Sequence, residues 1–230
     1  MADSNVELLT HIANALGDLR EHVVFVGGCA TALLLTDPGA PSVRATLDVD
    51  AVVGIVSLAE YYQLEAKLRA LGFTQTLEEG DPPYRWTIGG IKLDLMPADE
   101  KILGFSNRWY KLALLSFTIV QLREGLSIRL IAPALFVATK LEAFEDRGKG
   151  DYLESHDLED VLSVVDGRPE LLEELAHANP DARSYIVEVF GRLMMNEDFL
   201  NALPGLILEG SPAVRLPIVI ERLAKIAGVH

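Results

Sequence analysis

The chain has 230 residues, of which half are hydrophobic, a single cysteine and a net charge of −14. This composition is typical of a globular protein with one large core or two cores that share an interface. The acidity argues against a general nucleic-acid coat or a membrane-surface binder, since both need positive potential. One cysteine excludes an internal disulfide framework and a multi-cysteine zinc site.

The charge is distributed unevenly along the chain. Residues 101–150 carry a net charge of +4, whereas residues 1–100 and 151–230 each carry −9. This basic stretch is interpreted either as a solvated face or as the wall of a site for phosphates. No apolar run approaches the roughly 18 residues of a membrane-spanning helix, and the first ten residues lack the layout of a signal peptide. We therefore expect a cytoplasmic protein with no membrane partner.

The first sixty residues alternate helical and β patterns. Residues 5–18 place apolar side chains at helical spacing, and the apolar run 22–28 predicts a buried strand that enters a turn. Residues 29–35 favour a helix, which the Asp-Pro-Gly sequence at 37–39 ends. Residues 45–56 are rich in β-branched side chains and predict a second strand.

A longer helix and several short strands come next. Residues 57–72 predict a helix with Ser57 as its N-cap and Gly72 at its end. The β-like runs that follow are residues 73–77, 84–90, 91–96, 114–122 and 126–131. Gly89-Gly90 indicates a two-residue hairpin turn between the second and third of these runs.

From Pro133, which suits the first turn of a helix, the pattern becomes helical. Helical spacing recurs in residues 134–147, 156–167, 169–178, 182–195 and 214–228. We therefore expect an α+β fold in two domains. Residues 1–131 would hold a mixed sheet flanked by helices, and residues 132–230 would form a helical C-terminal part.

Asp48 and Asp50 form the most informative pair in the sequence. They are two residues apart on a predicted strand, so both carboxylates point to the same side of it. Two adjacent anions are unfavourable unless a positive charge lies between them, and carboxylate oxygens suit Mg²⁺ or Mn²⁺. The pattern favours a metal site, and the alternative is an exposed acidic end of a strand.

Asp94 lies in the middle of another apolar strand, where a lone carboxylate is costly to bury without a partner. If that strand pairs beside the strand of Asp48 and Asp50, three carboxylates converge and can hold the metal ions of phosphoryl-type transfer. In that arrangement, Asp94→Asn would raise the melting temperature of the metal-free protein by removing a like charge. The alternative is that Asp94 caps the end of the strand.

Gly27 and Gly28 stand between a predicted strand and the start of a helix. Bare backbone N–H groups at a positive helix end form a cradle for phosphate. Many strand-to-helix turns use glycine for tight packing alone, so the signal is weak by itself. The aspartate pair about twenty residues later strengthens it.

The segments VGGCATALLL, RATLDVD and IKLDLM together resemble the nucleotidyltransferase superfamily that shares the polymerase-β-like palm. The similarity is greatest to the AbiEii-like nucleotidyltransferases, which include toxin components of abortive-infection and toxin–antitoxin systems. It covers roughly residues 22–166. The resemblance implies a palm domain at 1–131, with a nucleotidyltransferase-type mixed sheet, and a helical domain at 132–230.

The resemblance also implies roles for individual residues. Asp48, Asp50 and Asp94 would bind Mg²⁺ or Mn²⁺ and act in catalysis together with Lys140, which by default is a solvent-facing lysine. The residues implied to bind the nucleotide are Gly27, Gly28, Arg44 and Thr46. The looser helical motif contributes Arg147, Asp157 and Asp160, and Lys149 nearby is a further candidate. The superfamily often has Gly-Ser at the phosphate turn, whereas here Cys29 follows, so a hydroxyl contact to phosphate would need Thr31.

The implied function is transfer of a nucleoside monophosphate from a nucleoside triphosphate to an acceptor hydroxyl on tRNA, a protein or a small molecule. An antitoxin would be a further partner. Two other interpretations remain open. One is a nucleotidyltransferase fold kept as an inactive protein-interaction module. The other is a haloacid-dehalogenase-type phosphatase, in which Asp48 would be the nucleophile.

Overall fold

The structure is a computed structural model that describes residues 3–75, 81–147, 151–207 and 212–228. It has the expected α+β architecture, with a six-stranded mixed sheet, flanking helices and a set of C-terminal helices. Compactness divides the chain into a sheet unit, residues 1–30 and 45–132, and a helical unit, residues 31–44 and 133–230. The expected division at residue 131 does not separate segment 31–44, which the structure groups with the helical unit.

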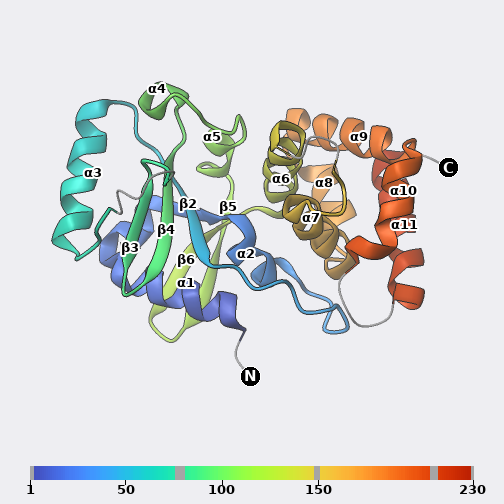
Figure 1. Cartoon of the computed structure of the whole chain (residues 1–230), viewed down its shortest axis with the longest axis horizontal. Helices are drawn as coiled ribbons and strands as arrows, with labels where there is room; N and C mark the ends of the chain where they lie inside the picture. Colours follow the sequence, from blue (N-terminus) through green and yellow to red (C-terminus); the bar gives the residue numbers. More distant parts are fainter. Residues whose placement is uncertain (1–2, 76–80, 148–150, 208–211, 229–230) are drawn as a thin grey trace. The chain divides into compact units, whose positions relative to one another are not determined.

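The sheet has the strand order β3-β4-β2-β1-β6-β5 (Figure 1). The strands are β1 (Val23–Val26), β2 (Asp48–Val53), β3 (Arg85–Ile88), β4 (Ile91–Pro97), β5 (Phe117–Arg123) and β6 (Leu126–Ile131). β2 pairs parallel with β4 and β1 pairs parallel with β6, whereas the other neighbours are antiparallel. β2 and β4 therefore lie side by side in the interior of the sheet, where both carry aspartates.

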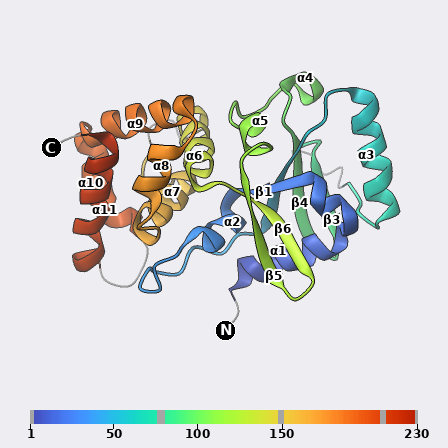
Figure 2. The ribbon, with the colours of Figure 1, turned by 180° about the vertical axis from the view of Figure 1, so that it is seen from behind.

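Helices flank this sheet (Figure 2). They are α1 (Ser4–Ala15), the 3-10 turn Gly17–His22, α3 (Leu58–Ala70), α4 (Glu100–Leu103) and α5 (Tyr110–Ala113). Helix α2 (Gly27–Leu34) begins in the sheet unit and ends in the helical unit. Helix α1 packs across β2, β4, β5 and β6 and buries Leu9 and Ile12 completely.

Most expected elements of the sheet unit are confirmed. Ser57 accepts a hydrogen bond from the Glu60 N–H at the start of α3, and Gly72 follows its end with φ +90°. The expected strand 73–77 is wrong where it is described, because only Thr74 forms a bridge, and residues 76–77 lie outside the described residues. Helices α4 and α5 were not expected, since four residues are too few for a periodic pattern.

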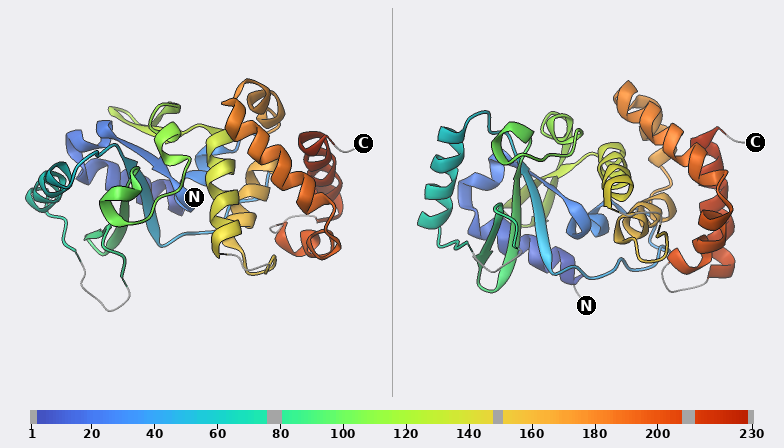
Figure 3. Two further views of the ribbon diagram at one scale, coloured as in Figure 1. Left: turned by 90° about the horizontal axis from the view of Figure 1, so that it is seen from above. Right: turned by 45° about the horizontal axis from the view of Figure 1, so that its top comes forward.

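The helical unit contains six C-terminal helices among its described residues (Figure 3). They are α6 (Pro133–Arg147), α7 (His156–Gly167), α8 (Leu171–His177), α9 (Pro180–Met194), α10 (Glu197–Leu206) and α11 (Pro212–Ala227). Helix α6 packs against α7, α8 and α9. Helix α10, which contains Pro204, was not expected from the sequence.

Segment 31–44 is attached to the helical unit by specific contacts. The N–H groups of Thr36 and Asp37 both donate to the Gly167 carbonyl at 2.9 Å. The Arg215 guanidinium pairs with Asp37 at 2.9 Å and with Asp166 at 2.8 Å. These bonds hold the segment on the end of α7. In the described ranges, no helix is both long and apolar enough to cross a membrane.

Candidate active site

The sheet unit gathers three aspartates on one face. Along β2, Val49 and Ala51 are completely buried, whereas Asp48 and Asp50 are partly exposed, so the two carboxylates share the more open side. In the parallel register Asp50 is paired with Asp94 of β4. Asp94 therefore lies beside the pair, as the sequence predicts for neighbouring strands. We call these three residues and the strand surface that bears them the carboxylate face.

Gly27 has a steric reason to be glycine. Its φ is +71°, and a Cβ built on it would lie 1.8 Å from Oδ2 of Asp50 and 2.6 Å from the Asp50 Cβ. The Asp50 side chain therefore occupies the space that any other residue at position 27 would fill. This contact places a carboxylate directly against the backbone at the start of α2, where Gly28 is buried. The two halves of the expected site, glycine turn and aspartate pair, are in contact.

Arg85 of β3 is a member of this face that the sequence analysis missed. Its Nε and Nη2 atoms donate to the two oxygens of Asp94, each at 2.7 Å. Nη2 also lies 3.4 Å from Oδ2 of Asp48, and Nη1 lies 3.3 Å from Oδ1 of Asp81. Its carboxylate neighbours, Asp94 foremost, raise the pKa of Arg85 above its ordinary value, so it stays charged. Asp94 thus has the partner that its burial requires.

The sequence did hold the signal for Arg85. The hairpin at Gly89-Gly90 has positive φ at both residues, so β3 and β4 pair from Ile88–Ile91 outward. Counting back from that turn places Arg85 opposite Asp94. The same register places Lys92 beside Asp48 in the parallel ladder and on the Asp94 side of β4.

The residues of the carboxylate face fit a divalent cation in chemistry and in register. Carboxylate oxygens are the ligands that Mg²⁺ prefers, and Asp50 and Asp94 are ladder partners. In the arrangement seen, however, the described residues contain no group of three histidine, cysteine, aspartate or glutamate side chains that could hold a metal ion. Asp94 is instead bound by the Arg85 fork.

Buried hydrogen bonds of Thr46 hold the start of β2 in place. It is buried, its N–H donates to Oδ1 of Asn5 at 3.0 Å, and its hydroxyl lies 3.1 Å from Sγ of Cys29. Burial raises the pKa of the Cys29 thiol to about 12, so this cysteine is an inert packing residue. Thr31 is also completely buried, so its hydroxyl is not available to a phosphate at the turn.

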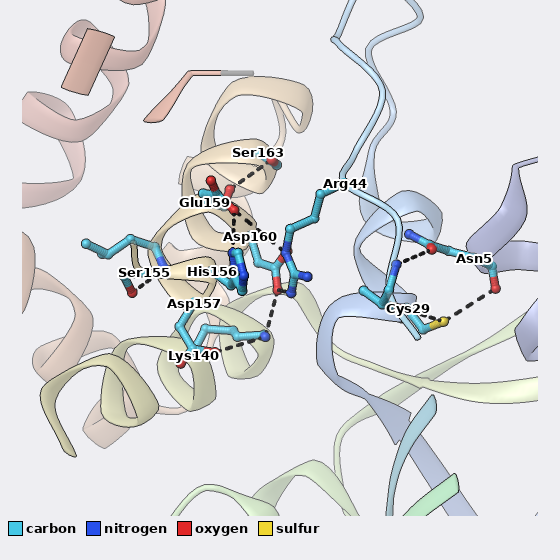
Figure 4. Close-up of polar contacts among 12 residues, drawn as sticks. Asn5, Cys29, Arg44, Lys140, Ser155, His156, Asp157, Glu159, Asp160 and Ser163 are labelled. Carbon is cyan, nitrogen blue, oxygen red and sulfur yellow. Dashed lines mark hydrogen bonds and ion pairs between the residues drawn. The ribbon is translucent and has the colours of Figure 1, made fainter. Parts of the chain in front are cut away.

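The helical unit collects the other candidate residues in an ion-pair network (Figure 4). Nζ of Lys140 on α6 lies 2.7 Å from Oδ2 of Asp160 and 3.0 Å from Oδ1 of Asp157, both on α7. Nη2 of Arg44 reaches Asp160 at 3.3 Å, and Nη2 of Arg147 reaches Asp157 at 3.0 Å. We call these five residues the helical network. Lys149 lies outside the described residues.

Two expectations about individual residues need correction. Lys140 is not a solvent-facing lysine, because it is 9% exposed and bound by two aspartates. The structure also argues against the expected stabilisation by Asp94→Asn. Since Asp94 accepts two short hydrogen bonds from a guanidinium, removing its charge removes an attraction rather than a repulsion.

The fold can be compared with known proteins. No family model matches the chain, and no curated protein matches it. A crystal structure of an antigenic nucleotidyltransferase-like protein from Paracoccidioides brasiliensis is 20% identical with a TM-score of 0.51, over 93% of this chain and 97% of that one. The solution structure of the antibiotic-resistance factor ANT(2'')-Ia is 17% identical with a TM-score of 0.46, over 87% and 99% of the chains. The first likeness shows that this chain has the fold of nucleotidyltransferase-like proteins.

Proposed function

We propose that this chain is a magnesium-dependent nucleotidyltransferase that moves a nucleoside monophosphate from a nucleoside triphosphate to an acceptor hydroxyl. The observation that carries the proposal is the carboxylate face, where Asp50 lies against the bare backbone of Gly27 and beside Asp94. Carboxylates next to a glycine turn at a helix start suit a polyphosphate bridged by a divalent cation. The nucleotidyltransferase-like fold agrees with this chemistry.

In this transfer the acceptor oxygen bonds to the α-phosphorus, the bond to the bridging oxygen breaks, and pyrophosphate leaves with that electron pair. A bound Mg²⁺ would neutralise phosphate charge. Asp48 and Asp50 would hold it, and Asp94 would complete the site and take the proton of the acceptor hydroxyl. The N–H groups at Gly27 and Gly28 would donate to the phosphates. The rate enhancement then comes mostly from positioning and charge neutralisation.

Lys140 stays in the proposal on the resemblance alone, as the cation that screens the departing pyrophosphate. Its ammonium already binds Asp157 and Asp160, so phosphate oxygens would have to replace a carboxylate. Arg44 and Arg147 belong to the same network and are proposed as its supports. The sheet unit offers Arg85 and Lys92 as further cations near the carboxylates.

The decisive experiment offers the protein each nucleoside triphosphate with Mg²⁺, labelled either at the α- or at the γ-phosphate. The acceptors are bulk tRNA, the protein itself and small hydroxyl compounds. A nucleotidyltransferase transfers the α-label to one acceptor and releases the γ-label in pyrophosphate. A phosphatase would release inorganic phosphate and transfer nothing, and an interaction module would leave both labels intact.

The AbiEii-like resemblance adds a proposal about biological role, that of a toxin held in check by an antitoxin. Its test is induced expression in a bacterial host. Arrested growth with the wild-type chain, and normal growth with Asp50→Asn at equal protein level, supports the role. Normal growth with both chains contradicts the toxin role. The transfer activity is tested separately by the labelling assay.

A further inference from the structure

Arg85 binds the same carboxylates that the proposed function assigns to the metal. Its planar fork covers both oxygens of Asp94 at 2.7 Å and extends to Asp48 at 3.4 Å. Asp94 is 8% exposed at its side chain, whereas Asp48 is 37% exposed. The guanidinium therefore covers Asp94 in the inner part of the face, whereas Asp48 and Asp50 remain partly exposed.

The charge balance of the face explains why a cation is needed there. Strands β2 and β4 bring Asp48, Asp50 and Asp94 to neighbouring positions of the sheet. Like charges on neighbouring side chains repel one another. Arg85 supplies the compensating positive charge, and its bidentate geometry is the strong form of this contact. In the absence of a divalent ion, part of the negative charge of the face is thus compensated from within the chain.

The same guanidinium has a second anchor that does not belong to the carboxylate face. Nη1 lies 3.3 Å from Oδ1 of Asp81, four residues earlier, whose side chain is 11% exposed. A guanidinium that leaves Asp94 and Asp48 can therefore keep a carboxylate partner at Asp81. Its departure need not leave a buried charge unpaired, which would be prohibitively unfavourable.

We propose that Arg85 is the resident counter-cation of the carboxylate face. Its guanidinium occupies the place of a divalent ion between Asp48 and Asp94 and leaves it when a metal–nucleotide complex binds. The proposal rests on the proposed function for the identity of the incoming ligand. Arg85 is accordingly a positioning residue that keeps the empty face folded and sets the threshold for metal loading. The triphosphate assists the exchange, because it offers the displaced guanidinium an anion.

The test measures the binding of Mn²⁺ alone to the full chain. Binding is detected as the loss of the free-ion signal in electron paramagnetic resonance. Arg85→Gln should tighten Mn²⁺ binding by about tenfold or more, since a competing charge in contact with the ligands is gone. Arg69→Gln is the matched control. It removes the same charge from the same unit, but its described partners are Glu65, Gln75 and the Trp86 ring. Binding to this control should stay within about twofold of wild type.

Unchanged or weaker Mn²⁺ binding by folded Arg85→Gln overturns the proposal and makes Arg85 an orienting partner of Asp94. Should that variant not fold, the wild-type chain carries the test through the Nε–H resonance of Arg85, assigned with Arg85→Lys. Saturating Mg²⁺ with a nucleoside triphosphate should shift this resonance and speed its exchange with solvent. A resonance that does not move overturns the exchange.

The labelling assay separates this proposal from the proposed function. If the wild-type chain transfers the α-label but Arg85→Gln binds Mn²⁺ with unaltered affinity, the counter-cation proposal alone is refuted. Tighter Mn²⁺ binding by the variant without any label transfer supports the counter-cation and refutes the transfer activity. If neither chain binds Mn²⁺ and no label moves, both proposals fail.

Discussion

The carboxylate face and the helical network are both built from aspartates and basic side chains, but their charge balance differs. In the network, Lys140, Arg44 and Arg147 meet Asp157 and Asp160, with Glu159 at 3.8 Å from Arg44. On the face, Arg85 contacts Asp48 and Asp94, and Asp50 lies against a glycine. The comparison teaches that a balanced network holds structure, whereas a surplus of anions invites a further cation.

The two regions also differ in how far their charged side chains are exposed to solvent. Asp160 is 2% exposed and Lys140 9% exposed, so neither is open to an incoming ligand without rearrangement. Asp48 is half-open to solvent at the edge of the face. We therefore assign ligand binding first to the sheet unit and stability first to the helical network.

The largest expected effect is on function, at the face. Asp48→Asn should abolish Mg²⁺-dependent binding of a nucleoside triphosphate in calorimetry and lower transfer by at least about 100-fold, because one charged ligand is lost. The fold should survive, since Asp48 is partly exposed. Asp18→Asn, at an exposed position of the same unit, is the control and should bind normally. Equal binding by Asp48→Asn would break the assignment of the face.

The next largest effect is on stability, in the network. Lys140→Met keeps the length of the side chain but leaves Asp160 buried with only part of its positive surroundings. We expect a loss of about 4 kcal/mol in the free energy of unfolding, measured by urea denaturation. Lys225→Met, which breaks an exposed pair with Glu221, should change it by less than about 0.5 kcal/mol. An equally small effect of Lys140→Met would remove the contrast between the two regions.

Gly27→Ala tests the steric link between the turn and Asp50. The new Cβ would meet the Asp50 side chain at 1.8 Å, and the alanine would have to adopt φ +71°. We therefore expect a destabilisation of about 3 kcal/mol. Gly125→Ala has a similar φ of +73° but nothing within 4 Å of its Cβ, so it should cost only about 1 kcal/mol. The difference between the two melting curves isolates the contact with Asp50. Identical curves would mean that Asp50 moves away freely.

The smallest effect concerns Asp94. Without metal, Asp94→Asn should lower the free energy of unfolding by about 1.5 kcal/mol, because the ion pair with Arg85 becomes a hydrogen bond to an uncharged amide. Thermal melting in a chelator measures this change. A higher melting temperature would instead show that repulsion among the three aspartates outweighs the attraction of Arg85.

Much of the fold follows from local patterns. Period-two alternation in β2 and β4, the glycine hairpin between β3 and β4, and Ser57 before α3 are each properties of a few neighbouring residues. Short elements were not expected, because the four residues of α4 leave no clear period. Glycine and aspartate motifs likewise predicted the carboxylate face, since both depend on strand alternation and turn chemistry.

Strand alternation, a property of the backbone, is enough to place Asp48 and Asp50 on the same side of a strand. The contact of Asp50 with Gly27, the bidentate contact of Arg85 with Asp94 and the burial of Lys140 between two aspartates arise from tertiary packing. These contacts join residues distant in the chain or in different elements. Their free energy depends on which side chains share a low-dielectric space, and that is set by packing rather than by spacing.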